Sequence, residues 1–109
     1  MSRVSDDTKL SQMSIPGTHD TMTAHASTDF LGLTGCPGGF AEFYCLTQTW
    51  KLETQLHNGI RFIDLRLVQR TSKIFDIYHG DYYLDVSLED VFETLETFLA
   101  TYPREMVMK

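Results

Sequence analysis

The chain has 109 residues, of which 42% are hydrophobic, so it is long enough to bury a core and richer in aromatic residues than disordered segments are. Its 15 acidic and 9 basic residues give a formal net charge of -6, which argues against nucleic-acid binding because that function needs a basic face. No apolar run approaches the roughly 20 residues that span a bilayer, and no hydrophobic stretch after Met1 resembles a secretory signal. Secreted and cytoplasmic locations both stay open.

A short strand is predicted over residues 10–15, stopped by the turn signal Pro16-Gly17. Residues 18–47 show little periodicity, and a connection of that length is typically functional or disordered. Its two cysteines, Cys36 and Cys45, lack metal-ligand spacing, so a disulfide and two thiols are both compatible with the sequence. Its apolar residues are compatible either with contact to a membrane surface or with packing onto the protein. These residues are Phe30, Leu31, Leu33, Phe40, Phe43 and Tyr44.

A short helix is predicted over residues 50–58, with Gly59 as its stop, and a strand follows over 60–68. Asp64 and Arg66 are two positions apart in this strand, so they project from the same face. On an isolated sheet such a pair indicates a solvated outer face. Beside a second helix–strand unit, we expect the pair at an open end of the sheet.

The second half of the chain repeats the alternation of strand and helix. A strand over residues 74–79 is closed by Gly80, and Ser87 with Asp90 forms a capping box that begins a helix ended by Pro103. The apolar residues of this helix recur with helical period: Leu88, Val91, Phe92, Leu95, Phe98, Leu99 and Tyr102. A further strand begins over 105–108. The order predicts an α/β architecture with parallel strands, to which residues 74–79 add a hairpin arm.

Polar residues follow the predicted strands. His19 and Asp20 follow the first, Asp64 and Arg66 belong to the second, and His79 ends the hairpin arm. We expect them to converge, because polar residues at the carboxyl ends of parallel strands gather at one edge. Two histidines can divide the work of general base and general acid, and an arginine can hold a phosphate with two hydrogen bonds.

The other two histidines are predicted to be structural. His25 lies in a Thr/Ser-rich loop and His57 on a helix surface. Neither follows a predicted strand.

The competing interpretation is a metal site built from His19, Asp20, Asp64 and His79. Arg66 counts against it, because a fixed cation repels a divalent ion at the same place. We therefore expect neither a metal nor another cofactor.

Four segments together resemble the phosphatidylinositol-specific phospholipase C X-domain family. They are SIPGTHDT at residues 14–21, the block 48–56 followed by GIRFIDLR at 59–66, Tyr78-His79-Gly80, and Pro103-Arg104-Glu105 after the capped helix. The match runs in one order over nearly the whole chain. It implies that residues 1–109 are the amino-terminal, incomplete part of a TIM-like (β/α) barrel.

The resemblance also implies a reaction. His19 would be the general base that deprotonates the inositol 2-hydroxyl, and His79 the general acid that protonates the departing diacylglycerol oxygen, leaving a cyclic inositol phosphate. Asp20 and Arg66 would act near the phosphate, and Asp64 would orient His79. Arg66 resembles the bacterial-like, metal-independent subgroup. The implied partners are phosphatidylinositol or a related inositol phospholipid and a membrane surface.

Two other functions stay open. One is a non-catalytic fragment or pseudoenzyme that binds a lipid headgroup or a protein partner. The other is a different barrel phosphodiesterase, such as a glycerophosphodiesterase, although Asp64-Leu65-Arg66 fits its metal-binding carboxylates poorly. In the family, later strands supply an acidic partner for the first histidine, much of the inositol pocket, and a basic residue shortly beyond Lys109. We therefore expect residues 1–109 alone to be inactive.

Overall fold

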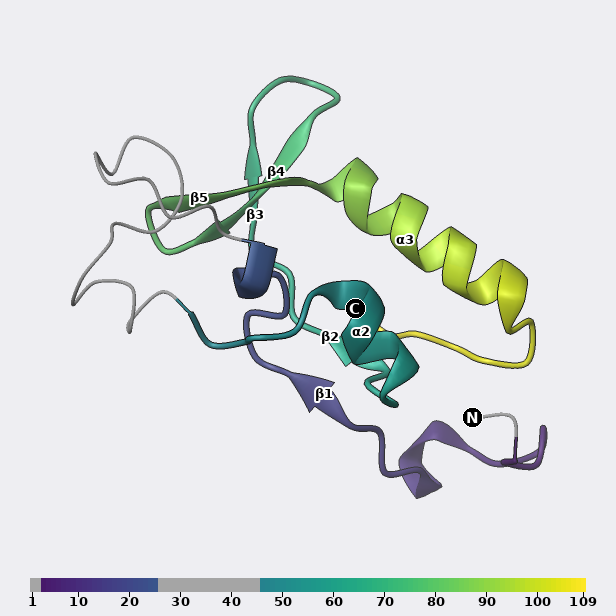
Figure 1. Cartoon of the computed structure of the whole chain (residues 1–109). Helices are drawn as coiled ribbons and strands as arrows, with labels where there is room; N and C mark the ends of the chain where they lie inside the picture. The colour runs from purple at the N-terminus through teal and green to yellow at the C-terminus, as the bar shows by residue number, and fades with distance from the viewer. Residues whose placement is uncertain (1–2, 26–45) are drawn as a thin grey trace.

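The protein is described by a computed structural model, which covers residues 3–25 and 46–109. Over these residues the fold is mixed α/β, as predicted, and contains a pair of parallel strands and a separate three-stranded antiparallel sheet (Figure 1). The elements are η1 (Leu10–Gln12) and η2 (Thr23–His25), both 3₁₀ helices, the α-helices α2 (Leu52–His57) and α3 (Leu88–Thr101), and the strands β1 (Gly17–Thr18), β2 (Phe62–Ile63), β3 (Leu67–Gln69), β4 (Phe75–His79) and β5 (Tyr82–Ser87).

The parallel part of the fold is narrow. β1 pairs with β2, with Gly17 opposite Phe62. On the other side of β2, Phe62 forms a parallel bridge with Met108, and Ile63 N donates to Met108 O over 2.9 Å. The predicted strand over residues 105–108 is thus reduced to this bridge. Three parallel segments lie side by side and do not close a barrel.

The strand predicted over residues 10–15 is wrong. Leu10–Gln12 forms the 3₁₀ helix η1. The start of this helix is capped by a hydrogen bond of 3.2 Å that Lys9 N donates to the Gln12 side chain. Parallel pairing begins only at Pro16, whose carbonyl accepts hydrogen bonds from the backbone N–H groups of residues 61 and 62. Pro16-Gly17 is therefore the entry into a strand and not the turn that the dipeptide predicted.

The strand predicted over residues 60–68 is interrupted. β2 ends at Ile63, and β3 begins at Leu67 in the other sheet. Between them the backbone of Asp64 binds Thr21, with Asp64 N donating to Thr21 Oγ1 over 2.8 Å and Thr21 N donating to Asp64 O over 3.1 Å. Arg66 O then accepts from Tyr78 N over 2.8 Å, which directs the chain into the antiparallel sheet.

The hairpin arm is larger than the sequence indicated. β4 matches the predicted strand, but β5, which no prediction covered, pairs with it and places Tyr82 opposite His79. The two-residue turn between them begins with Gly80 at φ 58°, a conformation that glycine adopts without a steric penalty. β3 completes the sheet on the far side of β4.

The long helix follows its sequence signals closely. Ser87 Oγ accepts from Asp90 N over 3.2 Å while Asp90 Oδ2 accepts from Ser87 N over 2.8 Å, so the predicted capping box is present. The carboxylate pKa of Asp90 lies below its ordinary value because the Ser87 backbone N–H, and then the Ser87 hydroxyl, donate to it. Helix α3 ends at Thr101, just before Pro103.

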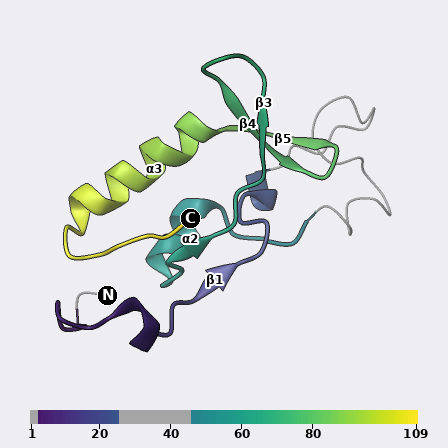
Figure 2. The ribbon, with the colours of Figure 1, turned by 180° about the vertical axis from the view of Figure 1, so that it is seen from behind.

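One core connects the two sheets and the helices. It contains Met22, Leu52, Leu56, Ile63, Ile77, Leu84, Val86, Val91, Leu95 and Phe98. Figure 2 shows the same arrangement from behind, with η1 at the end of the molecule opposite the β3–β5 sheet. In the described part of the chain, no helix has the length and apolar character needed to cross a bilayer.

Candidate active site

The structure brings together the five site residues that the sequence predicted. His19 and Asp20 follow the carboxyl end of β1, Asp64 and Arg66 lie in the break between β2 and β3, and His79 ends β4. The backbone bonds between Thr21 and Asp64 hold the first two segments against each other. The β3–β4 pairing brings the third segment alongside them.

Asp20 is the buried carboxylate of this cluster, with 4% of the residue exposed. Its Oδ2 atom lies 3.0 Å from His19 Nε2 and 3.4 Å from His79 Nε2, so one oxygen contacts both imidazoles. Its Oδ1 atom lies 3.5 Å from Arg66 Nε and, among the described residues, accepts no hydrogen bond. Asp20 thus connects both histidines and the arginine.

The Asp20 backbone has φ 45°, in the left-handed region that few non-glycine residues adopt. Its N–H donates to Asp64 Oδ2 over 3.2 Å. The strained conformation is therefore stabilised by a bond inside the site.

Asp64 and Arg66 form a bidentate pair. Arg66 Nε donates to Asp64 Oδ1 and a terminal guanidinium nitrogen donates to Asp64 Oδ2, each over 2.8 Å. These bonds hold the pKa of Asp64 well below its usual value, against a smaller opposing effect of burial, and they raise the pKa of Arg66 above its usual value. Both side chains are therefore charged at neutral pH.

His19 lies between the two carboxylates. Its Nδ1 atom is 3.1 Å from Asp64 Oδ2, opposite the contact between its Nε2 atom and Asp20. The side chain is 65% exposed, so a ligand can reach the ring from solvent. The proposed orientation of His79 by Asp64 stays a prediction, since the carboxylate oxygen found 3.4 Å from His79 Nε2 belongs to Asp20.

The cluster contains three possible metal ligands, because His19, Asp20 and Asp64 offer ligand atoms that lie within 4.8 Å of one another. The chemistry of the donor set argues against a metal. Arg66 donates to both oxygens of Asp64, so a divalent ion would have to displace a guanidinium and then lie beside its charge. The arrangement fits an anionic ligand better than a cation.

Sequence reasoning missed the polar residues that hold the histidine turn. The carbonyl of His19 accepts from Thr47 Oγ1 and from Gln48 Nε2, each over 2.9 Å. Gln55 reaches the same turn from α2. Gln55 could have been noticed, because it lies between Leu52 and Leu56 on the buried face of an otherwise amphipathic helix. Gln48 begins the block 48–56 that resembles the family, although no role was predicted for it, and Thr47 carries no such signal.

The histidines that were predicted to be structural lie elsewhere. His25 Nε2 accepts from Leu52 N over 3.2 Å, at the start of α2. The His57 ring packs edge-on against Phe98 and Tyr102, with centroids 5.7 and 5.8 Å apart. Cys36, Cys45 and the apolar residues between positions 30 and 44 lie outside the described residues.

The site is open to solvent, because the side chain of His19 is 65% exposed and that of Arg66 is 54% exposed. A hollow of about 340 Å³ lies between α2 and α3, and none of the five site residues lines it.

Comparison with known proteins gives the family. The model of the family "Phosphatidylinositol-specific phospholipase C, X domain" matches residues 13–108. The chain belongs to this family. Its relatives include a 1-phosphatidylinositol phosphodiesterase of Listeria monocytogenes, 37% identical over 99% of this chain and 30% of the relative, and one of Staphylococcus aureus, 26% identical over 99% of this chain and 31% of the relative.

Solved structures agree with this assignment. A Staphylococcus aureus phosphatidylinositol-specific phospholipase C, studied for its membrane binding, superposes with a TM-score of 0.80 at 27% identity over 99% of this chain and 33% of that one. The Listeria monocytogenes phosphatidylinositol-specific phospholipase C superposes with a TM-score of 0.77 at 37% identity, over 98% of this chain and 35% of that one. The chain thus spans about a third of the length of these relatives.

Proposed function

We propose that this chain carries the acid–base half of a phosphatidylinositol phosphodiesterase site, which cleaves the lipid to diacylglycerol and a cyclic inositol phosphate. The observation that carries the proposal is the contact of one buried oxygen, Asp20 Oδ2, with both His19 and His79. Two imidazoles held on one carboxylate, beside a guanidinium, suit a reaction that takes a proton from one oxygen of a phosphodiester and gives a proton to another.

The proposed first step is nucleophilic attack within the substrate. His19 accepts the proton of the inositol 2-hydroxyl, and the resulting oxygen attacks the neighbouring phosphorus. Asp64, 3.1 Å from His19 Nδ1, stabilises the imidazolium that forms. For Nε2 to reach the hydroxyl, it must exchange its contact with Asp20 for one with the substrate.

The proposed second step is departure of the lipid. The bond from phosphorus to the diacylglycerol oxygen breaks, and His79 donates a proton to that oxygen. Arg66 is about half exposed, so the N–H groups that do not bind Asp64 can donate to the phosphate while Asp64 holds the guanidinium. A permanent cation at this place stabilises the charge that develops on the non-bridging oxygens, the role that a metal ion takes in other phosphodiesterases.

The second candidate function is binding without turnover. In this function the half-exposed guanidinium of Arg66, beside the exposed His19, binds a phosphorylated headgroup that is not turned over. The proposed membrane contact is compatible with either function, and the exposed Trp50 and Tyr82 are the aromatic residues to test for it in vesicle sedimentation.

A chimaera separates the two functions. Residues 13–108 would replace the matching segment of the Listeria monocytogenes relative, so that the remaining two thirds of the barrel are supplied. We expect the folded chimaera to convert phosphatidylinositol to a cyclic inositol phosphate, identified by phosphorus NMR. A folded chimaera that binds inositol phosphate and yields no cyclic product would establish the binding function instead.

A further inference from the structure

One buried side chain forms hydrogen bonds with both ends of the turn that carries His19 and Asp20. Gln55 lies in α2 and is 1% exposed. Its Oε1 atom accepts from Thr18 Oγ1 over 2.7 Å, immediately before the turn, and its Nε2 atom donates to Thr21 O over 2.8 Å, immediately after it. Gln55 therefore binds both ends of the turn.

The same amide also fixes its own position. Gln55 Nε2 donates to Trp50 O over 2.7 Å, so the side chain is bound to the segment that leads into α2. Both polar atoms of the amide are hydrogen-bonded, and the residue has almost no contact with water. Such a group has one stable arrangement, because each alternative leaves a buried donor or acceptor unsatisfied.

From Thr21 the contacts continue to the second carboxylate. Thr21 is fully buried, and its Oγ1 atom accepts from Asp64 N over 2.8 Å while its N–H donates to Asp64 O over 3.1 Å. The position of Thr21 therefore sets where Asp64 lies relative to Asp20. That spacing in turn determines whether His19 can contact both carboxylates.

We propose that Gln55 is a positioning residue of the candidate active site, acting through Thr21 on the spacing of Asp20 and Asp64. The proposal rests on the proposed function for its catalytic consequence. Gln55 touches no reacting atom, and its effect is to hold the turn in which Asp20 keeps its left-handed backbone. A purely structural core glutamine would affect the whole fold evenly, whereas a positioning residue affects this turn first.

Two substitutions separate the contacts. Gln55→Glu keeps an acceptor for Thr18 and removes the donors to Thr21 O and Trp50 O, while Gln55→Met removes all three hydrogen bonds and nearly preserves volume. Gln69→Glu and Gln69→Met are the matched controls, since Gln69 is exposed on β3. Circular dichroism identifies any variant that unfolds, and the other Gln55 variant then carries the test.

The first measurement is amide hydrogen exchange in the 109-residue chain. We expect each folded Gln55 variant to lose at least ten-fold more protection at Thr21 and Asp64 than at Val91 and Leu95 of α3. The Gln69 controls should change neither group. An equal loss at all four amides would overturn the proposal. This result does not depend on turnover, so it stands apart from the proposed function.

The second measurement is the kinetics of the chimaera. Gln55→Glu should lower kcat at least ten-fold with KM changed by less than three-fold, because substrate still binds while the histidines are displaced. An unchanged kcat in the folded variant would overturn the positioning role. Absence of turnover in the unsubstituted chimaera would instead contradict the proposed function and leave the exchange result to decide this proposal.

Discussion

Arg66 donates two hydrogen bonds of 2.8 Å to Asp64, at a point where the chain has left one sheet and not yet entered the other. A regular strand through residues 64–66 would bind Asp64 N and O to a neighbouring strand. Instead they bind Thr21, and the two side chains are directed at His19 and Asp20. The break in the strand therefore builds the site.

The Arg66–Asp64 pair predicts turnover without metal. The chimaera should keep its activity in excess chelator, because the guanidinium already supplies the positive charge. Arg66→Lys should lose at least ten-fold in kcat, since an ammonium cannot bind Asp64 and phosphate in a planar, bidentate way. Arg104→Lys, at an exposed position far along the chain, is the control. Loss of activity in chelator would show that a metal is required and contradict the role given to Arg66.

His25 predicts a pH dependence of stability. Burial lowers the pKa of His25 below its ordinary value of 6.5, and the charge of Lys51 adds to the effect while Asp90 opposes it. A lowered pKa means that the folded state favours the neutral ring, which accepts the Leu52 N–H. This contribution is present above pH 6.5 and is lost as the pH falls through the folded pKa.

The measurement is the thermal midpoint of the chain between pH 8 and pH 5. His25→Gln is the comparison, because its amide oxygen can accept the same bond without titrating. The wild-type chain should lose more stability than the variant as the pH falls below about 6.5. If the thermal midpoints of the two proteins change with pH in the same way, His25 does not contribute to the pH dependence of stability.

The close approach of Phe62 to Gly17 predicts that this position of β1 does not tolerate a side chain. A Cβ atom at this position would lie 2.9 Å from Phe62 Cβ and 3.0 Å from Phe62 O, closer than atoms pack. Gly17→Ala should therefore lower the free energy of unfolding by about 1–3 kcal/mol, as overpacking does. Ser11→Ala, at an exposed position, should stay near wild type in chemical denaturation. An unaltered stability of Gly17→Ala would contradict the close approach of β1 to β2.

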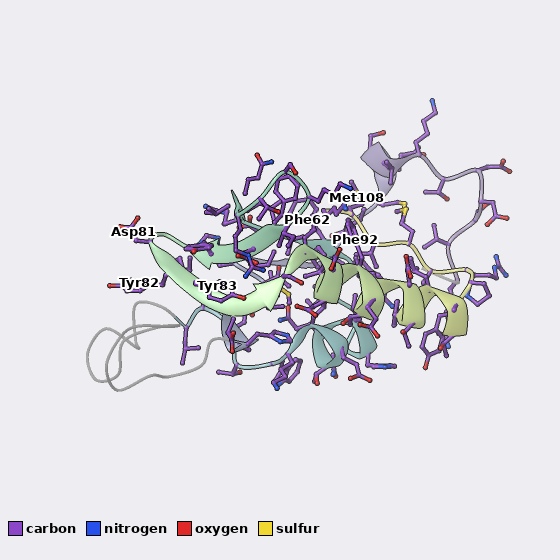
Figure 3. The ribbon with its side chains drawn as sticks, turned by 90° about the horizontal axis from the view of Figure 1, so that it is seen from above. Phe62, Asp81, Tyr82, Tyr83, Phe92 and Met108 are labelled. Carbon is purple, nitrogen blue, oxygen red and sulfur yellow. The ribbon has the colours of Figure 1, made fainter. Side chains whose placement is uncertain are left out.

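The exposed side of the parallel strands predicts self-association and no turnover for the 109-residue chain alone. Phe62, which forms the bridge with Met108, is 43% exposed, and Phe92 is 38% exposed; Figure 3 labels all three residues in the view from above. Lys109 Nζ, 3.8 Å from the centre of the Phe92 ring, covers little of this surface. We expect concentration-dependent sedimentation and no cleavage of phosphatidylinositol. A monomeric, fully active chain would contradict this prediction.

Local signals in the sequence predicted the helices well. The Ser87–Asp90 capping box and the period of Val91, Leu95 and Phe98 act within a few positions, so α3 could be predicted with its start and its end. Gly59, with φ 97°, ends α2 for the same local reason.

The strands were predicted less well, because pairing is decided by distant partners. Residues 10–15 have a strand-like pattern, yet the first pairing partner meets the chain at Pro16. Nothing near Asp64 signals that its backbone will bind Thr21. The five candidate site residues were predicted from their places at the ends of the expected strands and from the family motifs. Their exact contacts were not, and the link between Asp20 and His79 is visible only in three dimensions.

In the proposed function, His19 and His79 divide one acid–base reaction. The most direct test is kcat for phosphatidylinositol cleavage by the chimaera and by its His19→Ala, His79→Ala and His57→Ala variants. The kcat of His19→Ala and of His79→Ala should each fall roughly 10²–10⁴-fold, because each substitution removes one proton-transfer partner. His57→Ala, which removes a ring packed on Phe98, should stay within a few-fold while folded. Near-normal turnover in folded His19→Ala or His79→Ala would contradict the division of labour between the two histidines.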